Sequence, residues 1–158
     1  MRPKIPFKFK VIEGGKKKLE ERKRVMEKKF ENFFKAELEP IEHELKSLFG
    51  SLDKTDRKAE SLESQIFESE GRNALREKLL FECIASINAL RERQITLYKQ
   101  ALVHLHAFLE THGGEPGLNK CRAMIVNYTD TMKHFEQLME DGYNRASYLE
   151  ENLKQLHG

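Results

Sequence analysis

Apolar and polar residues alternate along the last forty residues of the chain with the period of a long helix. Apolar positions recur there at steps of three and four, and the intervening residues are mostly charged or amide side chains. These positions are Leu118, Cys121, Ile125, Tyr128, Met132, Phe135, Met139, Gly142, Ala146, Leu149, Leu153 and Leu156. A seven-residue repeat of this length predicts a helix over 117–157 with one apolar seam, which must be buried against other helices.

The segment 73–111 carries a broader apolar face, which is typical of a central helix with two neighbours. The face consists of Leu79, Leu80, Cys83, Ile84, Ile87, Leu90, Ile95, Leu97, Tyr98, Ala101, Leu102, Leu105, Phe108 and Leu109. Gly113-Gly114 then ends this helix, and Pro116 opens the next one. A short turn between two helices of similar length predicts an antiparallel hairpin.

The first half of the chain predicts a further helix over 16–49. Its first turns are charged, and its apolar face becomes continuous only from Phe30 onward. Pro40 lies inside this pattern and must kink the helix or begin a second one, because it lacks an N–H and clashes with the preceding turn. Gly50-Ser51 has the residue types of a helix stop followed by an N-cap.

A thinner apolar seam predicts another helix over 52–70. Gly71 interrupts the pattern there, and Asn73 has the side chain of an N-cap for the segment that follows. Glycine inside a helix costs only about 1 kcal/mol relative to alanine. The sequence therefore leaves open whether 52–111 forms one helix or two.

Residues 1–15 differ from the rest of the chain. Ile5, Phe7, Phe9 and Val11 alternate with proline and lysine, which is the period of an extended strand, and Gly14-Gly15 then interrupts the chain. We therefore expect a basic extended arm over 1–15 followed by one helical domain over 16–158. Whether the arm is ordered stays open.

Together these patterns predict an all-α fold, an elongated antiparallel helical bundle of coiled-coil character. It would contain three to four long helices and a short extended N-terminal arm. A charged fraction of 34% beside an apolar fraction of 39%, with no Trp, is typical of long amphipathic helices with much exposed surface.

The location of the protein follows from its cysteines and from its hydropathy. No stretch approaches the roughly 18 consecutive apolar residues that a membrane span requires. Cys83 and Cys121 lie on apolar helical faces without a Cys-x-x-Cys partner, which indicates buried free thiols in a reducing compartment. We expect a cytoplasmic protein, peripheral to a membrane under one alternative below.

The search for catalytic and metal-binding motifs favours a protein that is not an enzyme. His106 with Glu110 and Asp130 with His134 have the spacing of two metal ligands on one helix, but neither pair has a third ligand in sequence. No nucleophile motif and no phosphate-binding glycine loop after a strand is present. We therefore predict no catalytic residues, no cofactor, no metal and no small-molecule substrate.

Charge is unevenly distributed along the chain, although the formal net charge is only +2. Residues 1–30 hold twelve Lys or Arg against four Glu, and the remainder holds sixteen against twenty-two acids. An anionic surface would be contacted by Lys4, Phe7, Lys8, Phe9, Lys10, Lys16, Lys17 and Lys18. The competing interpretation is a solvated helix face, because Glu20, Glu21 and Glu27 have the spacing to neutralise their basic neighbours.

These observations favour a scaffold or adaptor that uses long helical faces to bind another protein or a second copy of itself, as a homodimer. The predicted interface consists of Tyr128, Met132, Phe135, Leu138, Met139, Gly142, Tyr143 and Ala146. At 139–146 large seam residues give way to small ones, which allows a close helix approach or leaves a groove for a partner.

Two alternatives remain beside the scaffold. Long helices after a basic segment are similar at fold level to BAR-type membrane-curving dimers, and this resemblance implies binding to an anionic lipid surface. Binding to nucleic acid through the same basic segment ranks third.

Overall fold

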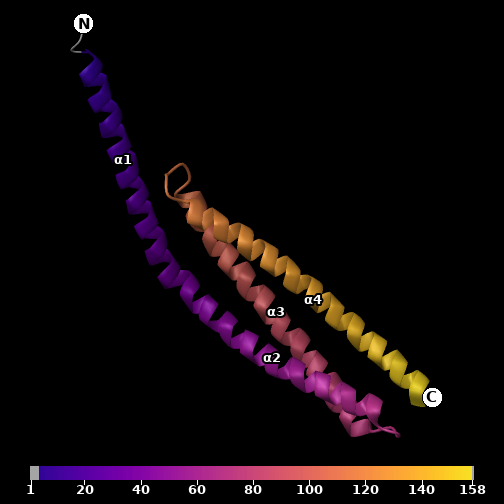
Figure 1. Cartoon of the computed structure of the whole chain (residues 1–158). Coiled ribbons are helices and arrows are strands. Elements are labelled where there is room, and N and C mark those ends of the chain that lie inside the picture. Colours follow the sequence, from indigo (N-terminus) through magenta and orange to yellow (C-terminus); the bar gives the residue numbers. More distant parts are fainter. Residues whose placement is uncertain (1–3, 158) are drawn as a thin grey trace.

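The computed structural model describes the backbone of residues 4–157 and the side chains of residues 15–156. The helices are α1 (Lys4–Phe33), the π-helix η1 (Phe34–Leu38), α2 (Glu39–Glu68), α3 (Ala74–Thr111) and α4 (Asn119–His157). Figure 1 shows that α1, η1 and α2 form one long, curved helical path beside the hairpin of α3 and α4. The described residues contain no strand, and the all-α fold is confirmed.

The π-helix accommodates Pro40. The N–H of Glu39 donates to the carbonyl of Phe34, five residues earlier, and Pro40 occupies the first turn of α2. Proline is tolerated there because the N–H groups of a first helical turn have no partner within an α-helix. The change of helix predicted at Pro40 is therefore confirmed, as a widened turn rather than a gap in the chain.

Two predicted boundaries in the first half are wrong. α2 continues through Gly50, because the burial of Leu45 and Leu52 on either side outweighs the small helical cost of one glycine. The extended arm predicted for residues 1–15 is contradicted over residues 4–15, which are helical because α1 begins at Lys4, and residues 1–3 lie outside the described residues. A helix satisfies its own backbone hydrogen bonds, whereas a strand needs a neighbouring strand.

The segment between α2 and α3 settles the question of one helix or two. α2 ends at Glu68, the following Ser69 has an extended backbone, and α3 begins after Asn73. The Asn73 side chain accepts a hydrogen bond from the N–H of Arg76 at 3.1 Å, so Asn73 is the predicted N-cap. Residues 52–111 therefore form parts of two helices.

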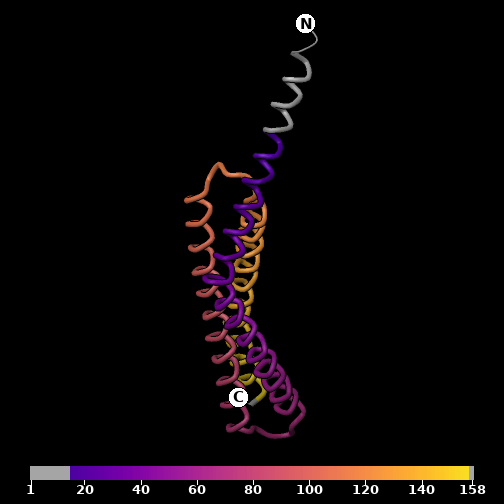
Figure 2. The backbone as a smooth tube through the Cα atoms, turned by 90° about the vertical axis from the view of Figure 1, so that its left-hand side faces the viewer, coloured from indigo at the N-terminus to yellow at the C-terminus, as the bar shows by residue number. Residues whose placement is uncertain are grey.

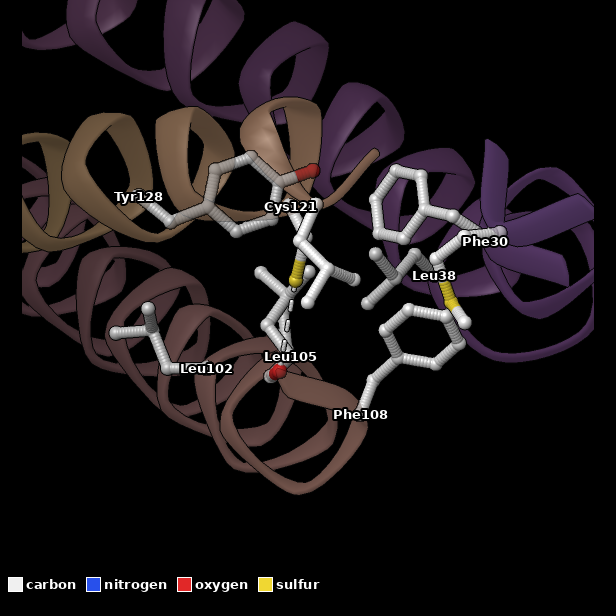
Figure 3. Packing of buried hydrophobic residues seen from close by; sticks show 10 residues of the cluster. Phe30, Leu38, Leu102, Leu105, Phe108, Cys121 and Tyr128 are labelled. Atoms are coloured by element: carbon white, nitrogen blue, oxygen red, sulfur yellow. Dashed lines mark hydrogen bonds between the residues drawn. The ribbon is translucent and has the colours of Figure 1, made fainter. Parts of the chain in front are cut away.

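α3 is the central helix, as its broad apolar face predicts. It packs against both α2 and α4, and the turn after Thr111 returns the chain antiparallel (Figure 2). One core cluster lies near that turn and brings residues of α1, η1, α3 and α4 together (Figure 3). Its most buried members are Leu38, Ala101, Leu105, Leu118 and Cys121.

A second core cluster lies toward the other end of the bundle, where α2, α3 and the last part of α4 meet. Its most buried members are Ala59, Leu80, Ile84 and Leu149. Between the two clusters, α3 carries the buried polar residues Asn88 and Gln94. Neither Asn88 Oδ1 nor Gln94 Oε1 has a hydrogen-bond partner among the described residues. Ile95 and Leu97 are buried in the same part of α3, so the two polar side chains interrupt the apolar interior without dividing it.

Candidate interaction surface

α1 extends beyond the hairpin turn of α3 and α4 (Figures 1 and 2). Every residue from 15 to 25 is exposed, and this stretch is called the α1 overhang below. Among the described side chains of α1, the first buried one is Met26, and Phe30 follows one turn later. Burial of α1 side chains against the bundle therefore begins at Met26, while Arg22 and Lys23 still contact the turn.

The apolar seam of α1 continues into the overhang after its intramolecular partners have ended. Leu19 lies one heptad before Met26 and hence on nearly the same side of the helix. Met26 is 4% exposed, whereas Leu19 is 52% exposed. The difference arises because Met26 belongs to the core cluster near the turn, whereas Leu19 does not pack against it.

α1 is held against the turn at a close backbone contact. Gly117 has a positive φ of 91°, and a Cβ added there would lie 2.7 Å from the carbonyl oxygen of Lys23. Only glycine fits both the dihedral angle and the approach of α1. Arg22 forms an ion pair with Glu115 of the turn at 3.0 Å. These contacts fix the point at which the overhang leaves the bundle.

Lys16, Lys17 and Lys18 are exposed on the overhang. The other predicted contacts to an anionic surface have side chains outside the described ones: Lys4, Phe7, Lys8, Phe9 and Lys10. The side chains of Arg24 and Val25 are also exposed on this stretch. The overhang therefore presents cationic and apolar side chains together.

Much of the predicted partner interface on α4 is used inside the chain. Tyr128 is buried, and its ring packs edge-on against Tyr98 of α3 at a centroid distance of 5.3 Å. Phe135 packs on the same Tyr98 ring at 5.7 Å. Met132 and Ala146 pack against the two core clusters. Leu138 and Met139 are half-buried, and Tyr143 is 53% exposed.

The groove predicted at Gly142 is occupied by α3. A Cβ added at Gly142 would lie 2.3 Å from Asn88 Oδ1. The absence of a side chain at Gly142 therefore lets the buried Asn88 approach the α4 backbone. The small residue provides room for a helix of the same chain, so of the two alternatives predicted for this stretch the structure has the close helix approach at Gly142.

A buried phenol joins α4 to α2. The Tyr128 hydroxyl donates a hydrogen bond to the Glu42 carboxylate. Burial and the bond to Glu42 together raise the pKa of Tyr128 well above its ordinary value of 10. Burial, with a smaller effect of the Glu42 charge, also raises the pKa of Tyr98. Both phenols therefore stay protonated, and their role is to hold α2, α3 and α4 together.

The outer face of the second half of α4 is acidic. Residues 136–151 hold five acids, Glu136, Glu140, Asp141, Glu150 and Glu151, and all five are exposed. The one basic residue there is Arg145, which pairs with Glu63 of α2 at 2.6 Å. Tyr143 and the 68% exposed Tyr148 lie at the two edges of this acidic face. It combines negative charge with exposed aromatic rings.

No known family, curated protein or solved structure matches this chain. Within the described part of the chain, no helix has a stretch long and apolar enough to cross a bilayer. Among the same residues, no three His, Cys, Asp or Glu side chains are grouped to hold a metal ion. The surfaces described above therefore carry the functional argument by themselves.

Sequence reasoning missed the apolar seam of the overhang, although a signal for it exists. Ile5, Ile12, Leu19 and Met26 are spaced by seven residues, which marks one side of a helix. The two-residue alternation in the same segment concealed this repeat. The buried Asn88 was also missed, because a polar residue within an apolar stripe does not reveal which helix will cover it.

Proposed function

We propose that this is a non-enzymatic scaffold or adaptor protein that binds a partner helix through the α1 overhang. One observation carries the proposal, namely that the seam buried at Met26 is exposed at Leu19. An isolated helical stretch of this length is marginally stable in water, and packing of its apolar side stabilises it. Both buried cysteines are free thiols, which supports a cytoplasmic location.

Helix docking fits the chemistry of the overhang. Leu19 supplies apolar area, and flanking lysines and glutamates supply charges of both signs. Charges beside an apolar seam select the partner and its orientation in paired helices. The proposed interaction surface is therefore the exposed continuation of a seam that the bundle uses elsewhere.

Site-specific photo-crosslinking tests the proposal. A benzophenone amino acid replaces Leu19 in the full chain, and the protein is irradiated in cells that express it. We expect a discrete protein adduct, because a docked helix would hold one partner within reach of the probe. The matched control carries the same probe in place of Lys46, which is exposed on α2.

The composition of the adduct decides the outcome. A protein adduct at position 19 that is absent at position 46 supports the proposal, whether the partner is this chain or another protein. If position 19 gives no protein adduct, or if both positions give the same diffuse products, the overhang is not a protein-binding surface.

Binding to an anionic lipid surface is the second candidate. It is favoured by the consecutive exposed lysines Lys16, Lys17 and Lys18 beside exposed Leu19. Each such charge contributes about 1 kcal/mol near an anionic membrane. Cosedimentation with phosphatidylserine vesicles, compared with neutral vesicles, tests it. Binding equal on both vesicle types, or none, would eliminate this candidate.

A further inference from the structure

We infer that the partner of the α1 overhang is a second copy of this chain, placed side by side and antiparallel. In this dimer, the overhang of each copy lies against the acidic outer face of α4 in the other. The inference rests on the proposed function, because it names the partner of the same surface. It follows from the charge and shape of the two ends of the molecule.

The charges of the two surfaces are complementary. The overhang (residues 15–25) contains six Lys or Arg against two Glu, and one of the six, Arg22, is paired with Glu115, while residues 136–151 of α4 contain five acids against one Arg. That arginine, Arg145, is already paired with Glu63 and lies near Asp56. Glu150 lies in a hollow that is also lined by Arg72, Lys78 and Lys154, so four of the five acids keep their negative charge for a cationic partner, and the overhang offers one.

Apolar side chains accompany the charges on both surfaces. Leu19 and Val25 are exposed on the overhang, and Tyr143 and Tyr148 are exposed at the edges of the acidic face. Exposed tyrosines are typical anchors of protein interfaces, because their rings bury a large area and keep a polar tip. Each surface thus offers apolar area framed by charge of one sign.

The two surfaces lie toward opposite ends of the same molecule. α4 begins at the turn beside the overhang and carries its acidic face away along the bundle, with a midpoint roughly 40 Å from the turn at 1.5 Å per residue. Because of this separation, one chain does not bring its own two surfaces together. In a two-fold antiparallel pair, the overhang of each copy meets the acidic face of the other. Both pairs of surfaces are then used, and the assembly is a closed dimer.

The charge pattern also favours a protein partner over a lipid surface. Glu20, Glu21 and Glu27 lie among the basic residues of α1, and they would face the same anionic headgroups. A folded protein surface can place its acids opposite the basic residues alone, whereas a uniformly anionic membrane cannot. A parallel pair is disfavoured, since it would place basic end beside basic end.

Charge-reversal variants of the full chain test the inference by sedimentation. The basic-end variant carries Lys16→Glu, Lys17→Glu and Lys18→Glu, and the acidic-face variant carries Glu136→Lys, Glu140→Lys and Glu151→Lys. We expect the wild type to form a dimer of two 18.5 kDa chains. Each variant alone should dissociate about tenfold or more readily, because three attractive contacts on each side become repulsive.

Mixing the two variants is the decisive arm. The reversed side chains then again have opposite signs, and the other contact of the pair has its native charges, so the mixture should regain association that neither variant shows alone. A matched control reverses Lys46, Lys54 and Lys58, which are exposed on α2, and it should dimerise like the wild type. Circular dichroism confirms that each variant remains helical.

Three results would overturn the inference. The first is a wild type that stays monomeric up to about 100 μM, a concentration at which even a weak dimer is populated. The second is a dimer whose stability neither variant changes. The third is a monomer that binds phosphatidylserine vesicles through Lys16–Lys18. A crosslinked adduct of Leu19 with a different protein would overturn self-association and leave the proposed function standing.

Discussion

Asn88 and Gly142 form a matched pair at the centre of the bundle. Asn88 is buried with its Oδ1 unpartnered, and it reaches the α4 backbone because Gly142 has no side chain. A buried polar group without a partner costs stability. Its position between two apolar clusters is nevertheless typical of residues that set the register of paired helices.

Gly142→Ala is expected to destabilise the protein by about 1 kcal/mol or more, because its Cβ would overlap Asn88 Oδ1 in a packed interior. Urea unfolding measures the change. In the Asn88→Ala background, the same substitution should become stabilising, since only the helical preference for alanine remains.

Gly50→Ala is the matched control for this pair. A Cβ at Gly50 meets nothing within 4 Å, so this change should stabilise α2 by about 0.5–1 kcal/mol. If Gly142→Ala and Gly50→Ala had the same effect, the close approach of Asn88 would carry no energetic weight.

The Tyr128 phenol predicts a loss of stability at alkaline pH. Its pKa is raised in the folded state, so the folded protein binds this proton more tightly than the unfolded chain. The protonated Tyr128 phenol therefore contributes its full stabilisation of the folded state below the unfolded pKa of about 10. This stabilisation is lost as the pH rises above that value. Urea unfolding between neutral and alkaline pH should show this decline, and Tyr128→Phe should reduce it. Tyr148→Phe, at an exposed tyrosine, should leave it unchanged.

At the scale of the elements, aromatic packing attaches α1 to the hairpin. The rings of Phe30 and Phe108 meet edge-on at a centroid distance of 5.4 Å, and Phe33 stacks on Phe108 at 4.6 Å (Figure 3 shows Phe30 and Phe108). α1 is otherwise tied to the turn by Arg22 and by the approach to Gly117. The attachment of α1 is therefore concentrated in a few side chains.

Phe30→Ala should cost about 3–5 kcal/mol, because it removes a buried ring from this cluster. Hydrogen exchange should accelerate in residues 15–33, while the hairpin of α3 and α4 stays protected for longer. Phe49→Ala is the control, since Phe49 is 66% exposed and its loss should change stability by less than about 0.5 kcal/mol. Uniform acceleration over all helices would show that α1 is not a separate unit.

At the scale of the whole molecule, the helices form an elongated rod with the termini toward opposite ends (Figure 1). The helical path from Lys4 to Glu68 is roughly 100 Å long at 1.5 Å per residue. Small-angle scattering of the basic-end variant should therefore give a radius of gyration well above the roughly 15 Å of a compact chain of 158 residues. A value near 15 Å would mean that the helices fold back into a globule in solution.

The sequence by itself determined the all-α fold, the central position of α3 and the hairpin turn, because each depends on local periodicity and turn chemistry. The heptads of α4 and the N-cap at Asn73 are signals of this kind. Two local signals gave wrong predictions, a helix stop at Gly50 and a strand from the alternation in the N-terminal segment. In both places helical hydrogen bonding and packing override the local preference.

Only the tertiary structure decided which apolar positions are covered. Met26 and Leu19 occupy equivalent positions in one seam, yet the hairpin ends between them, so one is buried and the other exposed. The small residue Gly142 allowed either a close helix approach or an open groove, and the position of Asn88 on α3 decided for the close approach. Periodicity specifies which side of a helix is apolar, whereas the lengths and register of the neighbouring helices determine where along that side a partner can still bind.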